Sequence, residues 1–524
     1  MSSTNTFAAN VKFYFDKRIV TIFFLGMSQG FPWVIISSSL TVWLKDSGID
    51  RATIGYAGAI LFSYAINFLW SPLIDRFNFG WLGKRLGNRR AWILSMQGII
   101  AGGCFIVGLF SPETDLRALV IVCIVIGVVA ATQDIAIDAY RIESFAEGQK
   151  EYLAAASSAI TAGWWTGYAG LGFFPLWLSD FPNWDWPEIY PFMSVVMIGL
   201  MLVTLLSKKA TETKRHQQQD LEKRYTTLLA GQSKRYNTIL LTATCSVPVI
   251  AFWTLFGNIG LSEAIADWSG FIFLIIVIEL IIISIILRQL WIVVDHTPPS
   301  STGSISRLHT ILAWLLVTLI QPLKQFFTRN GLALGLAILG FIILFKFGES
   351  FLGRMSIQFY KEVGFSNTVI AVFSKLGTWW VTIVCALIGG LINIKFGIVR
   401  GLFISGIAMA STNLLFSALA LIGPNLPLYG FAIVVDGLAA AWSTVSFVAL
   451  MSLLCDRTFT ATQYALMVSL GTLGRTLLSS TGGEVVNQLD GNWSLFFAIT
   501  SLMVLPSLIL LFYLKKKLTF LEQR

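Results

Sequence analysis

The sequence predicts an all-α polytopic membrane protein, built as two six-helix bundles with two extra transmembrane helices between them. Three observations lead to this prediction. Only 12% of the 524 residues are charged and 55% are hydrophobic, whereas soluble domains carry about 25% charged residues. Apolar stretches of about 20 residues recur along the chain. Similar sequence patterns also stand at matching places in its two halves. This composition excludes a soluble enzyme, a disordered chain and a disulfide-stabilised scaffold.

Fourteen apolar stretches are long enough to cross a bilayer as helices. The segment 306–330 is apolar over only about ten residues, so we predict an interfacial helix on the inner face there. A fifteenth span is the alternative. The predicted spans lie near 19–44, 52–74, 91–110, 117–139, 152–178, 188–207, 239–258, 269–294, 331–355, 368–391, 399–420, 429–453, 461–486 and 493–514.

The positions of the basic residues predict the orientation of these spans. With the N-terminus in the cytoplasm, most of the 37 Lys and Arg residues fall in inner connections. Only Lys45, Arg51, Arg117 and Lys361 fall in outer connections. The positive-inside rule therefore predicts that both termini are cytoplasmic and favours an even number of spans. We expect the basic residues of the polar stretch 208–238 to contact lipid headgroups, not nucleic acid.

An internal repeat divides the chain. WLKDSGIDRATIG at 43–55 aligns with FYKEVGFSNTVIA at 359–371, and both follow the first span of a six-span set. A duplicated six-helix unit is typical of alternating-access transporters whose site lies between the halves. Two weaker pairs of similar segments are 71–90 with 389–401 and 151–163 with 463–475.

The repeat predicts three parts. An N-terminal six-helix bundle covers 1–207, and a C-terminal six-helix bundle covers 331–524. The segment 208–330 between them holds a cytoplasmic loop, two extra transmembrane helices and the interfacial helix.

Several motifs resemble those of the major facilitator superfamily, and within it the AmpG-type muropeptide permeases. The stretch 75–90 is similar to the superfamily's loop between its second and third helices. The narrower resemblance rests on FLWSPLIDR (68–76), ATQDIAIDAYR (131–141), LFKFGE (344–349) and FTATQYAL (459–466).

The resemblance implies a major facilitator fold with two extra helices. It also implies a multi-pass protein of the bacterial inner membrane that imports anhydromuropeptides, GlcNAc-anhydroMurNAc with or without peptide, by proton symport for peptidoglycan recycling. A transporter of another bulky anion such as acetyl-CoA, or an efflux permease, is the alternative.

Charged and polar side chains inside apolar spans are functional candidates because their burial is costly. Asp134 and Asp138 are four residues apart and share a helix face. Asp134 lies about 25 Å along its helix from the outer end. We expect Gln133, Asp134 and Asn67 to line a substrate cavity. The alternative for Asp134 is a structural contact between helices.

Four charged residues near the inner surface are predicted to form a gate. They are Asp75, Arg76, Asp138 and Arg141. We expect Asp138 and Arg141 to pair with the basic 75–90 loop and to hold one conformation closed. A solvated surface network is the alternative.

The motif LFKFGE places Lys346 and Glu349 three residues apart on one helix face. A buried ion pair lowers the cost of both charges. A carboxylate that moves between apolar and cationic surroundings can bind and release a proton. Glu349 is therefore the first candidate for proton coupling and Asp134 the second, and Lys346 is a candidate substrate contact. A static ion pair is the alternative.

Further candidates follow from the carboxylates and sugar rings of the substrate that the resemblance implies. Arg475 is expected to bind substrate carboxylates, because a guanidinium forms two parallel hydrogen bonds with them. The alternative is an ion pair with an acid such as Asp436. Lys375, about 10 Å from the outer surface, is expected to attract anions. One of the adjacent Trp164 and Trp165 is a candidate to stack on a sugar ring, and the alternative for each is an ordinary membrane aromatic in contact with lipid or core.

No enzymatic activity is expected, because the sequence contains no HExxH or Walker motif and the predicted spans contain no histidine. The three histidines fall in or beside polar connections, so we expect no histidine metal site in the membrane. We expect no cofactor, no metal, no nucleic acid and no obligate protein partner. The expected partners are the glycopeptide substrate, protons and membrane lipids. Glu279, inside a predicted extra span, has no predicted role.

Overall fold

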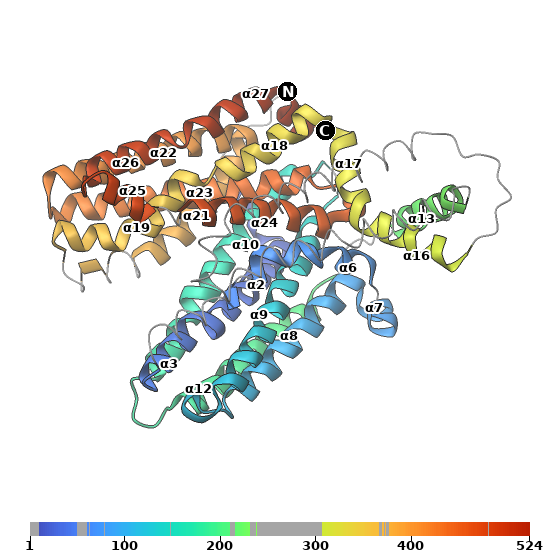
Figure 1. Cartoon of the computed structure of the whole chain (residues 1–524), viewed down its shortest axis with the longest axis horizontal. Coiled ribbons are helices and arrows are strands. Elements are labelled where there is room, and N and C mark those ends of the chain that lie inside the picture. Colours follow the sequence, from blue (N-terminus) through green and yellow to red (C-terminus); the bar gives the residue numbers. More distant parts are fainter. Residues whose placement is uncertain are drawn as a thin grey trace, which may run out of the picture. The chain divides into compact units, whose positions relative to one another are not determined.

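In the described part of the computed structural model, every regular element is a helix and none is a strand (Figure 1). The all-α fold class is therefore confirmed. The predicted extra spans at 239–258 and 269–294, and Glu279 with them, lie outside the described residues. The structure describes residues 10–49, 60–61, 63–77, 79–146, 148–209, 215–230, 237, 306–365, 369–370, 373, 377–479 and 482–523.

The chain divides into two compact units. The larger comprises Met1–Thr211, Ala333–Cys455 and Thr460–Arg524, and the smaller comprises Glu212–Leu332 and Asp456–Phe459. In the smaller unit, the described helices are α13 (Arg215–Ala230), α16 (Arg307–Leu315), η7 (Leu316–Ile320), α17 (Gln321–Asn330) and η9 (Arg457–Phe459).

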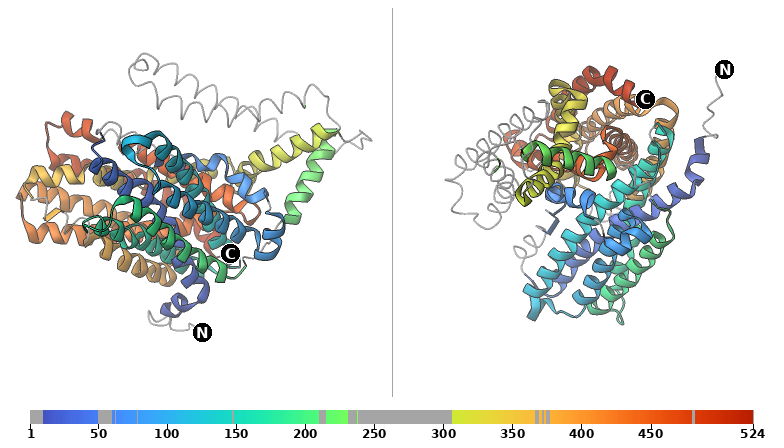
Figure 2. Two further views of the ribbon diagram at one scale, coloured as in Figure 1. Left: turned by 90° about the horizontal axis from the view of Figure 1, so that it is seen from below. Right: turned by 90° about the vertical axis from the view of Figure 1, so that its right-hand side faces the viewer.

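The larger unit begins with helices of the N-terminal half, and Figure 2 shows its blue-to-teal helices running alongside one another. They are η1 (Lys12–Phe15), α2 (Lys17–Trp33), η2 (Val34–Ser39), α3 (Leu40–Asp46), α5 (Ser63–Ile66), η4 (Asn67–Leu69), α6 (Ser71–Arg76), α7 (Gly80–Leu86), α8 (Asn88–Val107), α9 (Pro112–Glu143), α10 (Lys150–Trp165), η5 (Thr166–Leu171), α11 (Phe173–Leu178) and α12 (Trp186–Leu206).

The C-terminal half completes the larger unit. Its helices are α18 (Leu332–Leu344), α19 (Phe347–Val363), α21 (Thr378–Phe396), α22 (Ile398–Ile422), α23 (Leu426–Leu454), α24 (Thr460–Ser479), α25 (Gly482–Gln488), α26 (Trp493–Leu502) and α27 (Leu505–Gln523).

Nine helices of the described part are long and apolar enough to cross a membrane. The number is ten if Arg307–Thr318 and Gln321–Asn330, which are bent by 48°, form one span. Large apolar side chains such as Leu206 and Ile509 are exposed on these helices, as lipid-facing residues are. The count of fourteen spans and the interfacial placement of 306–330 stay predictions.

Close backbone contact fixes α2 against α10. A Cβ atom at Gly30 would lie 2.0 Å from the Trp164 carbonyl oxygen, and one at Gly163 would lie 2.0 Å from the Phe23 carbonyl oxygen. Only glycine fits at these two positions, as is common where membrane helices pack closely. This contact sets the positions of Trp33 and Trp164, which extend from the ends of the two helices.

The span that begins at α18 is interrupted in its middle. Helix α18 ends at Leu344 and α19 begins at Phe347. Between them, Lys346 has a non-helical backbone, with φ −100° and ψ 11°, and forms the N-cap of α19. Transporters often place their substrate and ion sites at interrupted helices of this kind. The interruption carries the predicted pair Lys346 and Glu349.

Candidate functional site

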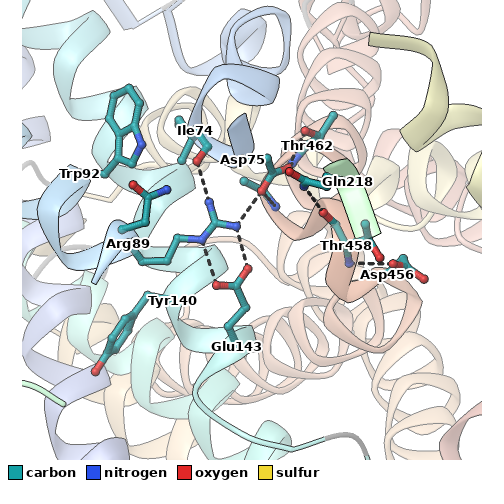
Figure 3. A network of polar contacts seen from close by, with 12 residues as sticks. Ile74, Asp75, Arg89, Trp92, Tyr140, Glu143, Gln218, Asp456, Thr458 and Thr462 are labelled. Carbon is teal, nitrogen blue, oxygen red and sulfur yellow. Dashed lines mark hydrogen bonds and ion pairs between the residues drawn. The ribbon is translucent and has the colours of Figure 1, made fainter. Parts of the chain in front are cut away.

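A network of ion pairs centred on Arg89 joins α6, α8 and α9 (Figure 3). Arg89 is the second residue of α8, and its Nη2 lies 2.7 Å from Asp75 Oδ1 and 2.7 Å from Glu143 Oε1. Its Nε donates to Glu143 Oε2 at 2.9 Å, and its Nη1 donates to the Ile74 carbonyl oxygen at 2.9 Å. The planar guanidinium therefore binds Glu143 through two hydrogen bonds and Asp75 through a third.

Asp75 also binds the first turn of α24, in the C-terminal half. Its Oδ2 accepts hydrogen bonds from the Thr462 backbone N–H at 2.9 Å and from the Thr462 hydroxyl at 2.7 Å. Its Oδ1 accepts from the Ala461 N–H at 3.3 Å, and the side chain is 1% exposed. A helix N-terminus favours an anion because its N–H groups have no partner within the helix. We call Asp75, Arg89, Glu143 and Thr462 the latch, because together they connect the two halves.

A second connection between the halves runs through Arg141, whose side chain is fully buried. Its Nη2 lies 3.2 Å from Asp138 Oδ1, and its Nη1 donates to Ser157 Oγ at 3.2 Å. The same Nη1 donates to Ser452 Oγ of α23 at 3.0 Å, and the guanidinium lies 5.3 Å from the ring centre of Tyr464. Arg141 thus contacts two helices of the C-terminal half.

The predicted gate residues occupy two separate clusters. Asp75 lies in the latch and meets the basic 75–90 loop through Arg89, while Asp138 and Arg141 pair with each other. The side chain of α9 that pairs with the 75–90 loop is Glu143, through Arg89, and not Asp138 as we expected. Glu143 is the last residue of α9 and lies level with the start of α8. Arg76 is half-buried at the end of α6. The gating role of these residues stays a prediction.

The predicted cavity residues of the N-terminal half differ in their surroundings. Gln133 is fully buried and donates from Nε2 to the Ser28 carbonyl oxygen at 2.6 Å, which ties α9 to α2. Asn67 Oδ1 accepts from Ser469 Oγ at 3.0 Å, which ties η4 to α24. Asp134 Oδ1, by contrast, is buried and has no hydrogen-bond partner in the described part of the chain.

The structure brings Lys346 and Glu349 together in a polar cluster. Lys346 Nζ donates to the Glu349 carboxylate, to Ser443 Oγ at 2.7 Å and to Thr444 Oγ1 at 2.9 Å. The Lys346 side chain is 8% exposed and that of Glu349 is 27% exposed. The two hydroxyls of α23 solvate the ammonium, so the lysine has partners besides the carboxylate.

A second carboxylate, Asp436 of α23, completes this cluster. It interacts electrostatically with both Lys346 and Glu349, and its Oδ1 accepts from Thr412 Oγ1 at 2.8 Å. The Thr412 hydroxyl also lies 2.9 Å from the Met409 carbonyl oxygen. It can therefore donate to an ionised Asp436, or accept from a protonated one while it donates to Met409. Two carboxylates facing one lysine can share a single proton.

The tandem tryptophans lie at the end of α10. The Trp164 ring centre lies 5.8 Å from that of Trp33 and 5.2 Å from that of Tyr168. The Trp165 ring centre lies 5.4 Å from that of Trp164. Both tryptophans are half-buried.

Other predicted residues lie outside the described part. Lys375 is one of them, and of Arg475 only the backbone, within α24, is described. Within the described ranges, no cluster of three His, Cys, Asp or Glu side chains is placed to hold a metal ion.

Sequence reasoning missed several residues that connect the halves. Arg89 lies in the 75–90 motif, and Glu143 stands two residues after the end of the 131–141 motif, but neither motif shows that these two side chains pair. Tyr14 had no sequence signal, yet its hydroxyl lies 2.6 Å from Ser158 Oγ and donates to the Leu387 carbonyl oxygen at 3.0 Å. Burial raises the pKa of Tyr14 to about 12, so its hydroxyl keeps its proton at neutral pH.

Residues 22–378 match the Major Facilitator Superfamily. The chain belongs to this superfamily. It is 27% identical over 508 residues to a putative transporter AmpG 4 of Rickettsia conorii, across 97% of this chain and 98% of the relative. It is 25% identical over 513 residues to an anhydromuropeptide permease of Escherichia coli strain K12, across 97% of this chain and 82% of the relative.

Solved structures of this superfamily are similar to the chain in fold. The proton:xylose symporter XylE bound to 6-bromo-6-deoxy-D-glucose matches with a TM-score of 0.54 and 14% identity, across 97% of this chain and 96% of that one. A double-tryptophan mutant of XylE matches with a TM-score of 0.58 and 13% identity, across 96% of this chain and 97% of that one. The predicted major facilitator fold and the resemblance to AmpG-type permeases are thus confirmed, and the chain is a multi-pass membrane transporter of the superfamily.

Proposed function

We propose that this transporter imports anhydromuropeptides, GlcNAc-anhydroMurNAc with or without peptide, from the periplasm to the cytoplasm by proton symport, and so serves peptidoglycan recycling. The substrate class is supported by the similarity to the anhydromuropeptide permease over nearly the whole chain. In this proposal the protein lies in the bacterial inner membrane with both termini in the cytoplasm. The asymmetric distribution of Lys and Arg supports that orientation.

The observation that carries proton coupling is the Lys346–Glu349 pair at the interrupted span. Buried ion pairs contribute little net stability, so one kept inside a membrane span suggests a functional role. Protonation of Glu349 would cancel its attraction for Lys346, which keeps Ser443 and Thr444 as partners. The lysine would then be available to a substrate anion. Glu349 is the proposed first coupling group and Asp134 the second.

Alternating access is proposed to occur by rocking of the halves 1–207 and 331–524 about the substrate. The latch and the Arg141 contacts hold the halves together at the end of the spans that carries the 75–90 loop. Passage to the cytoplasm would require Asp75 to leave Thr462. The proposed substrate contacts are Asn67, Gln133, Asp134, Trp164, Trp165, Lys346, Lys375 and Arg475, and the proposed gating residues are Asp75, Arg76, Asp138 and Arg141.

The test is uptake of radiolabelled GlcNAc-anhydroMurNAc by proteoliposomes that hold the purified full-length chain under an imposed pH gradient. We expect accumulation on the alkaline side and its loss when an uncoupler collapses the gradient. Uptake that ignores the gradient would contradict symport. Competition by acetyl-CoA but not by unlabelled disaccharide would contradict the substrate class, and chemically altered substrate would indicate an enzyme.

A further inference from the structure

Within the described residues, helices α2, α5 and α9 each carry a buried polar side-chain atom that has no hydrogen-bond partner. These atoms are Trp33 Nε1, Tyr64 Oη and Asp134 Oδ1. The ring centres of Trp33 and Tyr64 are 4.8 Å apart, and Tyr64 interacts electrostatically with Asp134. Folded proteins pair most buried polar atoms, and an unpaired one destabilises the fold. Neighbouring rings of α2 and α5 thus carry two such atoms, and Asp134 of α9 is near enough to act electrostatically on Tyr64, which suggests a ligand that supplies their partners.

A row of aromatic rings extends from Trp33. Trp33 and Trp164 meet edge to face, with ring centres 5.8 Å apart and planes inclined by 70°. Tyr168 continues the row, 5.2 Å from Trp164. All four aromatic residues are half-buried and therefore keep part of their surface exposed. Helices α2 and α10 lie side by side (Figure 1), and the glycine contact between them holds them in fixed register, so the rings are positioned before any ligand binds.

The chemistry of this cluster fits a sugar ring. It offers two neutral donors, the indole N–H of Trp33 and the hydroxyl of Tyr64, and one acceptor, the carboxylate of Asp134. A pyranose presents hydroxyl and acetamido groups at its edge and an apolar C–H surface on its face, which packs on aromatic rings. Trp33, Tyr64, Asp134 and Trp164 include no cation, so they are not suited to the carboxylates of a peptide stem.

The C-terminal half adds a further indole, that of Trp379, next to the π-helical turn η5 of the N-terminal half. Trp379 Nε1 is also buried without a partner in the described part of the chain. The Trp379 ring packs on Gly170 of η5 so closely that a Cβ atom there would lie 2.9 Å from its Cζ2. Since η5 begins directly after Trp165, this indole brings the other half of the transporter close to the aromatic row.

We propose that Trp33, Tyr64, Asp134 and Trp164 form a saccharide subsite that binds an aminosugar ring of the substrate. This assignment rests on the proposed function and adds Trp33 and Tyr64 to the substrate contacts. It also selects Trp164 from the tandem pair, because Trp164 is the one that contacts Trp33. The peptide stem and its carboxylates would lie elsewhere in the transporter.

The experiment measures equilibrium binding of radiolabelled GlcNAc-anhydroMurNAc to the full-length chain in detergent, with no proton gradient. Tyr64→Phe and Trp33→Phe each remove one donor and keep an aromatic ring. We expect each to weaken binding about three- to tenfold, the effect of one neutral hydrogen bond. The matched controls are Tyr513→Phe and Trp177→Phe, at side chains that are 62% and 45% exposed on the helix surface. They should bind like the wild type.

Thermal unfolding without ligand separates a binding role from a structural one. Tyr64→Phe removes a buried hydroxyl that has no hydrogen-bond partner among the described residues, so its unfolding temperature should equal or exceed that of the wild type. A lower unfolding temperature with unchanged binding would overturn the subsite. Wild-type affinity in both Trp33→Phe and Tyr64→Phe would also overturn it while leaving the proposed function intact. If the wild type itself failed to bind the disaccharide, both the subsite and the proposed function would be wrong.

Discussion

The latch predicts a large shift in conformational equilibrium when Asp75 is replaced by asparagine. Four donors converge on the Asp75 carboxylate: Arg89 Nη2, the Ala461 and Thr462 backbone N–H groups, and the Thr462 hydroxyl. An asparagine has one acceptor oxygen, and its NH₂ group would face another donor. Of these four bonds, only those from Ala461 and Thr462 join the halves, because Arg89 belongs to the same half as Asp75.

The size of the shift follows from these bonds. A hydrogen bond to a charged group contributes about 1.5–3 kcal/mol, and an anion at a helix N-terminus contributes about 0.3–1 kcal/mol more. Asp75→Asn should lose about 3 kcal/mol of latched-state stability, because at least one charged bond and the helix-terminus interaction disappear. That change moves the equilibrium between latched and unlatched states by about a hundredfold.

Distance distributions between two spin labels, from double electron–electron resonance, can measure this equilibrium. Lys84→Cys on α7 and Lys516→Cys on α27 place one exposed label on each half, in a background without native cysteines. Asp75→Asn should convert a narrow distance distribution into a broader and longer one. Asp46→Asn is the matched control, since Asp46 accepts from Trp186 Nε1 at 3.0 Å within one half. An unchanged distribution in Asp75→Asn would refute the reasoning.

Three further predictions follow from other contacts. Glu349→Gln should abolish accumulation driven by a pH gradient while substrate counterflow persists, because an amide keeps a contact with Lys346 but cannot take up a proton. The control is Glu113→Gln, at an exposed site. Gradient-driven uptake by Glu349→Gln would contradict coupling at Glu349. Gly30→Ala should lower stability by about 1–3 kcal/mol in thermal unfolding, since its Cβ would meet the Trp164 carbonyl oxygen, whereas Gly98→Ala meets nothing within 4 Å and should be neutral. Tyr14→Phe should destabilise by about 1 kcal/mol, the value of one hydrogen bond. Because the Tyr14 pKa is raised from 10.0 to about 12, this difference should be constant below pH 10 and disappear as the pH rises through about 12, and a difference that changes near neutral pH would contradict it.

Local features of the sequence were sufficient for the fold class. A helix that crosses a membrane must be apolar over about 20 residues, whatever it packs against, so α9 and α22 could be located from composition alone. The pair Lys346 and Glu349 could be found in the same way, because an ionisable side chain in such a stretch is rare and its partner lay three residues away.

Contacts between distant helices could not be predicted in this way. Asp75 and Thr462 are separated by 387 residues, and their bond depends on how the halves meet. Asp436 could be recognised as a lone carboxylate in an apolar span, but not as a neighbour of Lys346. In a soluble helix, the apolar face shows which side is buried. Helices α22 and α23 are apolar all round, so the sequence does not show which face meets protein and which meets lipid.

The sequence by itself therefore determined that this protein is a bundle of membrane-spanning helices with a few ionic groups inside, because hydrophobic length and charge are local properties. Only the tertiary structure decided that Asp75 binds the N-terminus of α24, that Lys346 binds Ser443 of α23 and that the rings of Trp33 and Tyr64 meet. The physical reason is that each of these contacts depends on how the helices are rotated and how closely they pack. Within uniformly apolar lipid, interhelical hydrogen bonds and backbone contacts determine that rotation and packing.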